Sequence, residues 1–102
     1  MARLGGYSLA VGETVAFSVD FTAVSAGGAI TLNSAKAYDI NGNDVSSTII
    51  ASSPPPVVQG TAVNLYINGG PIQATYYLSV TVTIVNTSEV REGSIELTVA
   101  RF

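Results

Sequence analysis

The amino-acid sequence predicts an all-β chain that folds as an immunoglobulin-like antiparallel β-sandwich of six to eight short strands, without significant helix. Apolar residues recur at every second position over much of the chain, which is the period of a half-buried strand. Thirteen Val, eight Ile and ten Thr give many β-branched side chains, which fit a pleated surface better than a helix. Turn-forming residues separate the alternating segments, so the strands are short.

The alternation places each strand. It is cleanest in residues 76–84, where apolar and mostly hydroxyl side chains follow one another, and it is least regular in residues 30–38. No segment shows the 3.6-residue period of an amphipathic helix. The expected strands, in chain order, are residues 14–21, 30–38, 48–51, 61–67, 76–84 and 94–99.

The segments between the strands carry recognisable turn chemistry. Asn41-Gly42 is typical of a tight hairpin, because both residues tolerate a positive φ. Residues 52–56 contain three successive prolines, which predict an extended connection without ladder hydrogen bonds. Residues 69–71 and 86–88 are predicted turns.

One tyrosine favours an immunoglobulin-like sandwich in particular. Tyr76 lies two residues before the inward-facing Leu78, near the start of a long strand. This is the position of the tyrosine corner, whose hydroxyl bonds to backbone a few residues upstream. Leu78 would then occupy the position of the second cysteine of an antibody domain, and Phe17 or Val19 that of the first.

The length predicts one domain, over residues 13–102, preceded by an N-terminal arm or first edge strand at residues 1–12. The opening residues lack the apolar core of a signal peptide. No run approaches the roughly 20 apolar residues that cross a bilayer. We therefore expect a soluble protein that is made without export.

The composition excludes several kinds of chemistry. The absence of Cys and His removes thiol nucleophiles, imidazole bases and zinc-type centres. A net charge of −3 argues against a phosphate-binding patch, so no nucleic-acid partner is expected. No cofactor is predicted.

The acidic residues are expected to serve turns. Residues 39–44 resemble a fragment of a calcium loop, but the positions of the EF-hand Gly and Glu are not met, so Asp39 and Asp44 are predicted to cap a hairpin. Acids at hairpin tips lack the desolvating pocket of a hydrolase pair. The single lysine, Lys36, has no Ser-x-x-Lys spacing. We therefore predict no catalytic and no metal-binding residue, and no enzymatic activity.

Aromatic residues and low charge together suggest an interaction surface. Only 11% of the residues are charged, and tyrosine enrichment with charge depletion marks the centres of protein interfaces. Tyr66 and Tyr77 should point away from the core, because they alternate with inward-facing residues. The outer strands also carry few Lys residues that would discourage pairing. The candidate interface residues are Tyr7, Tyr66, Tyr77, Arg91 and Phe102.

Several segments carry a likeness to a known family. They are Val19-Asp20-Phe21, the turn at residues 28–30, Asp39-x-x-Gly42-x-Asp44-Val45, Val63-x-Leu65-x-x-x-Gly69-Gly70, Tyr76-x-Leu78-x-Val80-x-Val82-Thr83 and Arg91-Glu92-x-x-Ile95-x-Leu97-x-Val99. Through these segments, residues 13–99 resemble the small β-sandwich proteins of tailed bacteriophages known as fibre–tail adaptors or phage fibre proteins. The chain departs from that pattern in two turns, at residues 70–75 and 86–90, each of which lacks a glycine usual in the family.

The resemblance implies a non-enzymatic virion component, present in several copies at the neck or tail, that connects tail machinery to fibres or spikes. Its partners would be other virion proteins and copies of itself, with no membrane and no small-molecule substrate, and it would be assembled in the cytoplasm of the bacterial host. Two alternatives use the same fold. One is a capsid decoration or head-fibre protein, and the other is a carbohydrate-binding module in which Tyr66 and Tyr77 stack on sugars.

Overall fold

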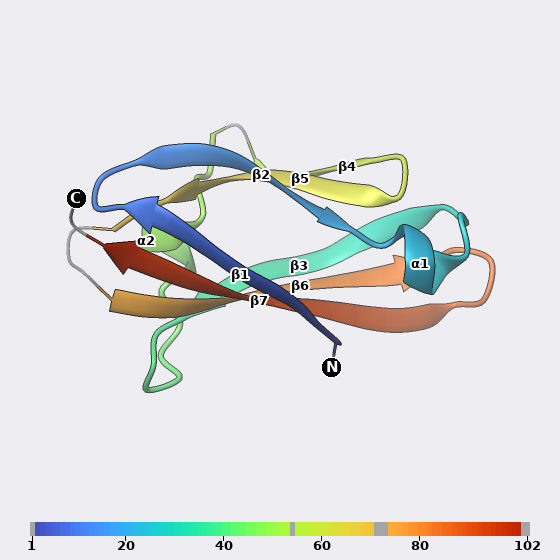
Figure 1. Cartoon of the computed structure of the whole chain (residues 1–102). Coiled ribbons are helices and arrows are strands. Elements are labelled where there is room, and N and C mark those ends of the chain that lie inside the picture. The colour runs from blue at the N-terminus through green and yellow to red at the C-terminus, as the bar shows by residue number, and fades with distance from the viewer. Residues whose placement is uncertain (1, 54, 71–73, 101–102) are drawn as a thin grey trace.

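The computed structural model describes residues 2–53, 55–70 and 74–100, with side chains from residue 8 onward. Over these residues the chain forms seven strands and two one-turn helices (Figure 1). In chain order they are β1 (Ala2–Ala10), β2 (Thr14–Asp20), α1 (Thr22–Ser25), β3 (Ile30–Tyr38), α2 (Ser46–Ile49), β4 (Val57–Gln59), β5 (Ala62–Asn68), β6 (Ala74–Ile84) and β7 (Glu89–Ala100).

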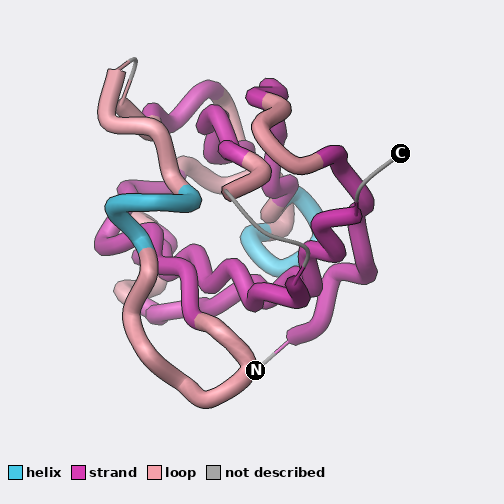
Figure 2. The backbone as a smooth tube through the Cα atoms, turned by 90° about the vertical axis from the view of Figure 1, so that its left-hand side faces the viewer, coloured by secondary structure: helices cyan, strands magenta, loops and turns pink. Residues whose placement is uncertain are grey.

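The strands form a sandwich of two sheets. A four-stranded sheet has the order β1-β7-β6-β3, and a three-stranded sheet has the order β2-β5-β4. Viewed along the strands, the two layers face each other (Figure 2). The second, fifth and fourth strands share one sheet while the third, sixth and seventh share the other, which is the immunoglobulin-like order. The predicted all-β sandwich is confirmed.

The first strand departs from the expected antiparallel pairing. β1 runs parallel to β7, from Ala2 beside Gly93 to Ala10 beside Ala100 (Figure 1). In immunoglobulin constant domains the first strand lies in the sheet of the second, whereas here the chain changes sheet at residues 11–13. Alternation of side chains gives the face that a strand buries but not its partner, so the sequence left this pairing open.

The strand expected at residues 48–51 is wrong. Thr48 and Ile49 lie in α2, and Ile50 makes a single antiparallel bridge to β5. Oδ1 of Asp44 accepts hydrogen bonds from both the backbone N–H (2.9 Å) and the hydroxyl (2.6 Å) of Ser46, which starts the turn. Ile49 and Ile50 are both buried. Consecutive residues of a strand point to opposite faces, so a helical turn is what allows both to enter the core.

A second helical turn, α1, follows β2 and was also not predicted. It has the same local cause, because Oδ1 of Asp20 accepts hydrogen bonds from the backbone N–H (2.8 Å) and hydroxyl (2.6 Å) of Thr22. The helices α1 and α2 lie at opposite ends of the sandwich (Figure 1). No helix in the described residues has the length and apolar character needed to cross a membrane.

The core lies between the sheets and is formed by the inward positions that the alternation predicts. Val63, Ile67, Leu78 and Leu97 are fully buried, and their outward neighbours are polar or aromatic except for Ala62. Tyr76 is also buried. The upstream residues 71–73, where its tyrosine-corner partner is expected, lie outside the described residues.

The Asn41-Gly42 turn forms as predicted. Gly42 has a φ of +86°, and its N–H donates to the carbonyl oxygen of Asp39 over 3.0 Å. The turn closes a short hairpin through an antiparallel bridge between Tyr38 and Asp44.

Candidate interaction surfaces

The two outer faces of the sandwich are polar and carry few charges. On β2 and β5 the outward side chains of the three-stranded sheet include one charged group, Asp20. They are Thr14, Ala16, Ser18, Asp20, Ala62, Asn64, Tyr66 and Asn68. The surface therefore has little charge to repel or desolvate when another molecule covers it.

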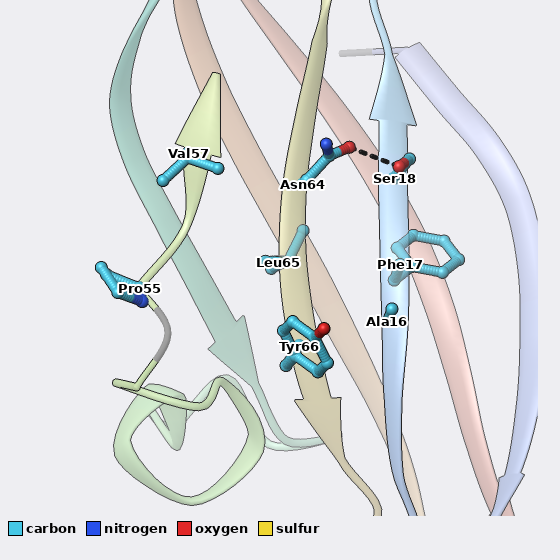
Figure 3. A pocket seen from close by; sticks show the side chains of 8 residues that line it. All are labelled: Ala16, Phe17, Ser18, Pro55, Val57, Asn64, Leu65 and Tyr66. Atoms are coloured by element: carbon cyan, nitrogen blue, oxygen red, sulfur yellow. Dashed lines mark hydrogen bonds between the residues drawn. The ribbon is translucent and has the colours of Figure 1, made fainter. Parts of the chain in front are cut away.

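A shallow groove crosses this face (Figure 3). Its volume is about 380 Å³, and Tyr66 contributes an aromatic ring that is 40% exposed. Pro55 and Val57 form the side toward β4, while Ala16 and Ser18 form the side on β2.

Hydrogen bonds fix the polar side chains of the groove. Oδ1 of Asn64 accepts from the Ser18 hydroxyl, and its Nδ2 donates to Oε1 of Gln59 over 2.6 Å. One asparagine therefore ties all three strands of the sheet together. The amide is held in place across β2, β5 and β4, so a ligand would meet an ordered polar group beside the Tyr66 ring.

The outer face of the four-stranded sheet is dominated by hydroxyl groups. Tyr38, Tyr77 and Glu96 lie side by side on β3, β6 and β7, and all three are half-buried. The Ser79 hydroxyl donates to the Glu92 carboxylate. The remaining outward hydroxyl residues are Ser8, Thr31, Ser34, Thr75, Thr81, Thr83, Ser94 and Thr98.

The structure separates the predicted interface residues. Tyr66 lies on the three-stranded sheet and Tyr77 on the four-stranded sheet, on opposite outer faces, so they cannot contact one ligand together. Arg91 is engaged near the β6–β7 turn, where its Nη2 lies 2.9 Å from Oε2 of Glu89. Phe102 and the side chain of Tyr7 lie outside the described residues.

The carboxylates of the turns are occupied by local donors. The backbone N–H and then the side-chain amide of Asn43 hold the pKa of Asp39 below its ordinary value. The hydroxyl and backbone N–H of Ser46 lower the pKa of Asp44, and Lys36 adds an ion pair at 3.6 Å. Within the described residues no three His, Cys, Asp or Glu residues gather as metal ligands.

Apart from Tyr66, the exposed large apolar side chains of the described residues lie at the ends of the sandwich and on β4. Val24 of α1 and Val85 and Val90 of the β6–β7 hairpin lie at one end, with exposed fractions of 38%, 52% and 60%. Ile40, which is 72% exposed, lies in the loop at the other end. Sequence reasoning missed these groups, because only the folded chain brings Val24 to the same end as the β6–β7 hairpin.

Comparison with known proteins bears on the fold. No protein-family model and no curated protein matches the chain. Among solved structures, the whole chain is similar to part of a family 123 glycoside hydrolase from Clostridium perfringens, described in a study of glycolipid glycan hydrolysis, with a TM-score of 0.53 and 13% identity. The chain spans 23% of the length of that structure. At this identity the likeness concerns the sandwich fold alone.

Proposed function

We propose that this protein is a non-enzymatic structural subunit that connects two other protein components, and that it serves in a bacteriophage virion as a neck or tail adaptor for fibres or spikes. The observation that carries the proposal is the placement of exposed apolar groups at opposite ends of a rigid sandwich. The valines at the α1 end and Ile40 at the α2 end are separated along the longest dimension of the molecule, which extends over 42 Å. An adaptor needs two separate adhesive surfaces held at a fixed distance.

The polar faces between the two ends fit the same role. The face of the three-stranded sheet, whose only charged outward group on β2 and β5 is Asp20, allows neighbouring subunits to lie side by side with little burial of unpaired charge. Several weak contacts repeated around a particle give firm attachment through avidity, so no single surface has to bind tightly. The virion setting itself comes from the family resemblance of residues 13–99.

The proposal is tested in two stages. Mass spectrometry of purified phage particles should detect the protein at a fixed stoichiometry, and antibody labelling should place it at the tail vertex. Labelling over the whole head would instead favour a capsid decoration protein. Absence from intact particles would refute the virion role.

Variants then separate the two ends. Replacing Val85 and Val90 by Ser should abolish attachment to one component, and Ile40→Ser should abolish attachment to the other. Thr98→Ala, an exposed change on the sheet face, is the matched control and should leave both attachments intact. Particles that assemble normally with both end variants would contradict the adaptor geometry.

Carbohydrate binding is a second candidate function, favoured by the groove around Tyr66. An exposed aromatic ring beside a fixed amide is a common way to hold a sugar, because the ring stacks on the sugar while the amide bonds its hydroxyls. Tyr66→Ala should abolish binding on a glycan array, and Tyr77→Ala on the opposite face should not. A native protein that binds no glycan would exclude this function.

A further inference from the structure

One regular sheet edge of the sandwich is open, along β2. All seven residues of β2 pair one to one with β5, without any register shift. No strand of the described residues pairs with β2 on its other side. β2 thus forms a regularly paired edge strand of the three-stranded sheet.

The hydrogen bonds at both ends of β2 show which backbone groups face the open side. The N–H of Phe21 donates to Thr61 (2.8 Å), and the carbonyl oxygen of Glu13 accepts from Gly69 (2.7 Å), so odd-numbered residues bond toward β5. In an antiparallel pair alternate residues bond to opposite sides. The backbone groups that point outward therefore belong to the even-numbered positions, which are Thr14, Ala16, Ser18 and Asp20.

The other three edges are each protected against pairing. β1 is interrupted by a register shift between Arg3 and Gly6. β3 is covered near its end, where the N–H of Val45 donates to Ala37 (2.8 Å) and the hydroxyl of Ser46 accepts from the Ala37 N–H (2.9 Å). β4 has only three residues and follows three successive prolines in the sequence. Bulges, covering segments, short strands and prolines are the usual devices that prevent edge-to-edge association.

β2 has none of these devices. Its sequence contains no Lys, Arg, Pro or Gly, its single charge stands at the last position, and its outward side chains are exposed. The contrast with the three protected edges indicates that a further strand pairs with the open edge of β2.

We propose that β2 is a dimerisation edge, to which β2 of a second copy adds in antiparallel orientation about a two-fold axis at Phe17. Even-numbered residues must then face even-numbered residues, because these carry the outward backbone groups. The axis at Phe17 places Ala16 opposite Ser18 of the partner subunit and Thr14 opposite Asp20 of the partner subunit. Every outward N–H and C=O of the strand gains a partner in this register.

The distribution of charge favours a second copy in this orientation. Glu13 directly precedes β2, and Asp20 is its last residue. Antiparallel pairing places Asp20 opposite the uncharged Thr14, whereas parallel pairing would place each acid beside its own copy, which is destabilising. Two-fold pairing also closes the assembly, because each copy has one such edge and uses it. The inference does not depend on the proposed function.

Charge variants test the register with full-length protein. Ala16→Lys with Ser18→Lys places lysine opposite lysine twice in each dimer and should raise the dimer Kd about tenfold or more. Ala16→Lys with Ser18→Glu changes the same two positions but places lysine opposite glutamate, so its Kd should equal or fall below that of the native protein. Both variants lose the same hydrogen bond from Ser18 to Asn64, which makes them matched controls.

Sedimentation equilibrium measures the dimer constant, and circular dichroism verifies that both variants fold. A native protein that stays monomeric at concentrations up to about 1 mM would overturn the proposal, since even a millimolar Kd would then be visible. Equal dissociation of the two variants would overturn the register.

Cysteine cross-linking provides a second measurement, because the chain has no cysteine of its own. Hydrogen-bonded residues on antiparallel strands have Cα atoms about 5.5 Å apart, within disulfide range. A mixture of Ala16→Cys and Ser18→Cys chains should therefore oxidise to a covalent dimer. Each variant alone should not, because its cysteines are displaced by two residues, about 6.6 Å along the strand. Cross-linking of either variant alone with the same yield would contradict the two-fold axis at Phe17.

Discussion

Replacing Gly69 by Ala should destabilise the protein strongly, although the change adds one methyl group. Gly69 follows β5 and packs against the turn that joins β1 to β2. A Cβ atom at this position would lie 2.1 Å from the carbonyl oxygen of Ala10 and 3.1 Å from the nitrogen of Gly12. Both neighbours are backbone atoms, so no change of rotamer relieves the contact. The Ala10 oxygen would have to move 1.3 Å to reach 3.4 Å, the lower limit of ordinary contact.

The cost follows from what this movement disrupts. The N–H of Gly69 donates to Glu13 (2.7 Å), and the N–H of Gly12 donates to Gly70 (3.1 Å), so the two loops hold each other. Each hydrogen bond contributes about 1 kcal/mol net, and overpacking costs about 1–3 kcal/mol more. Alanine restricts the unfolded chain more than glycine does, and this offsets the loss of stability by about 0.4–1 kcal/mol. We expect the free energy of unfolding to fall by about 2–4 kcal/mol.

Urea unfolding followed by circular dichroism measures this loss. With a slope of about 1–2 kcal/mol per molar urea, the midpoint should fall by about 1–4 M. Gly60→Ala is the matched control, because its φ is +64° but nothing lies within 4 Å of the added methyl. In that variant the free energy of unfolding should fall only by the cost of holding alanine in a left-handed backbone conformation, about 1–2 kcal/mol. A midpoint for Gly69→Ala at or above that of Gly60→Ala would refute the close approach of the two loops.

Three further predictions concern the core, the β3 edge and the acidic turn. Leu78→Ala removes a fully buried side chain and should lower the free energy of unfolding by about 2–5 kcal/mol in urea melts, whereas less than 1 kcal/mol would contradict its burial. Ser46→Ala deprives the Ala37 N–H of its acceptor, so the free energy of unfolding should fall by about 1–3 kcal/mol in thermal melts. An unchanged Tm would contradict this role of Ser46. The folded pKa of Asp39 is lowered, so its contribution to stability is complete above the ordinary carboxyl pKa of about 3.9 and is lost as the pH falls through the folded pKa. The free energy of unfolding should therefore drop below about pH 4 in acid titrations, and less steeply in Asp39→Asn. An identical fall in the free energy of unfolding in that variant would show that Asp39 does not contribute to the acid sensitivity.

The strands could be predicted because their cause is local. In β5 and β6 one face is uniformly buried, and the period of two alone identifies it, as the burial of Val63, Leu65 and Ile67 shows. The strand predicted at residues 48–51 does not form, and the cause is also local, although the alternation of side chains does not reveal it. Two adjacent isoleucines resemble a β-branched strand segment. However, the carboxylate of Asp44 accepts hydrogen bonds from Ser46 and so starts a helical turn ahead of the two isoleucines.

The candidate surfaces could be predicted only in part. The outward orientation of Tyr66 and Tyr77 follows from alternation, but their placement on opposite faces depends on which sheet each strand joins. The groove needs Ser18 beside Asn64, residues that are 46 positions apart in the chain. Such pairings are non-local, so they are invisible in the spacing of residues along one segment.

The sequence by itself determined that this chain forms short strands with one apolar face, a turn at its Asn-Gly segment, and few charges on its surface. Only the tertiary structure decided that β1 pairs with β7, that Val24 comes to the same end as the β6–β7 hairpin while Ile40 lies at the other, and that the edge of β2 stays open. The physical reason is that side-chain burial is set residue by residue through alternation. Partner choice instead depends on backbone hydrogen bonds, which every strand offers equally until the whole sandwich is packed.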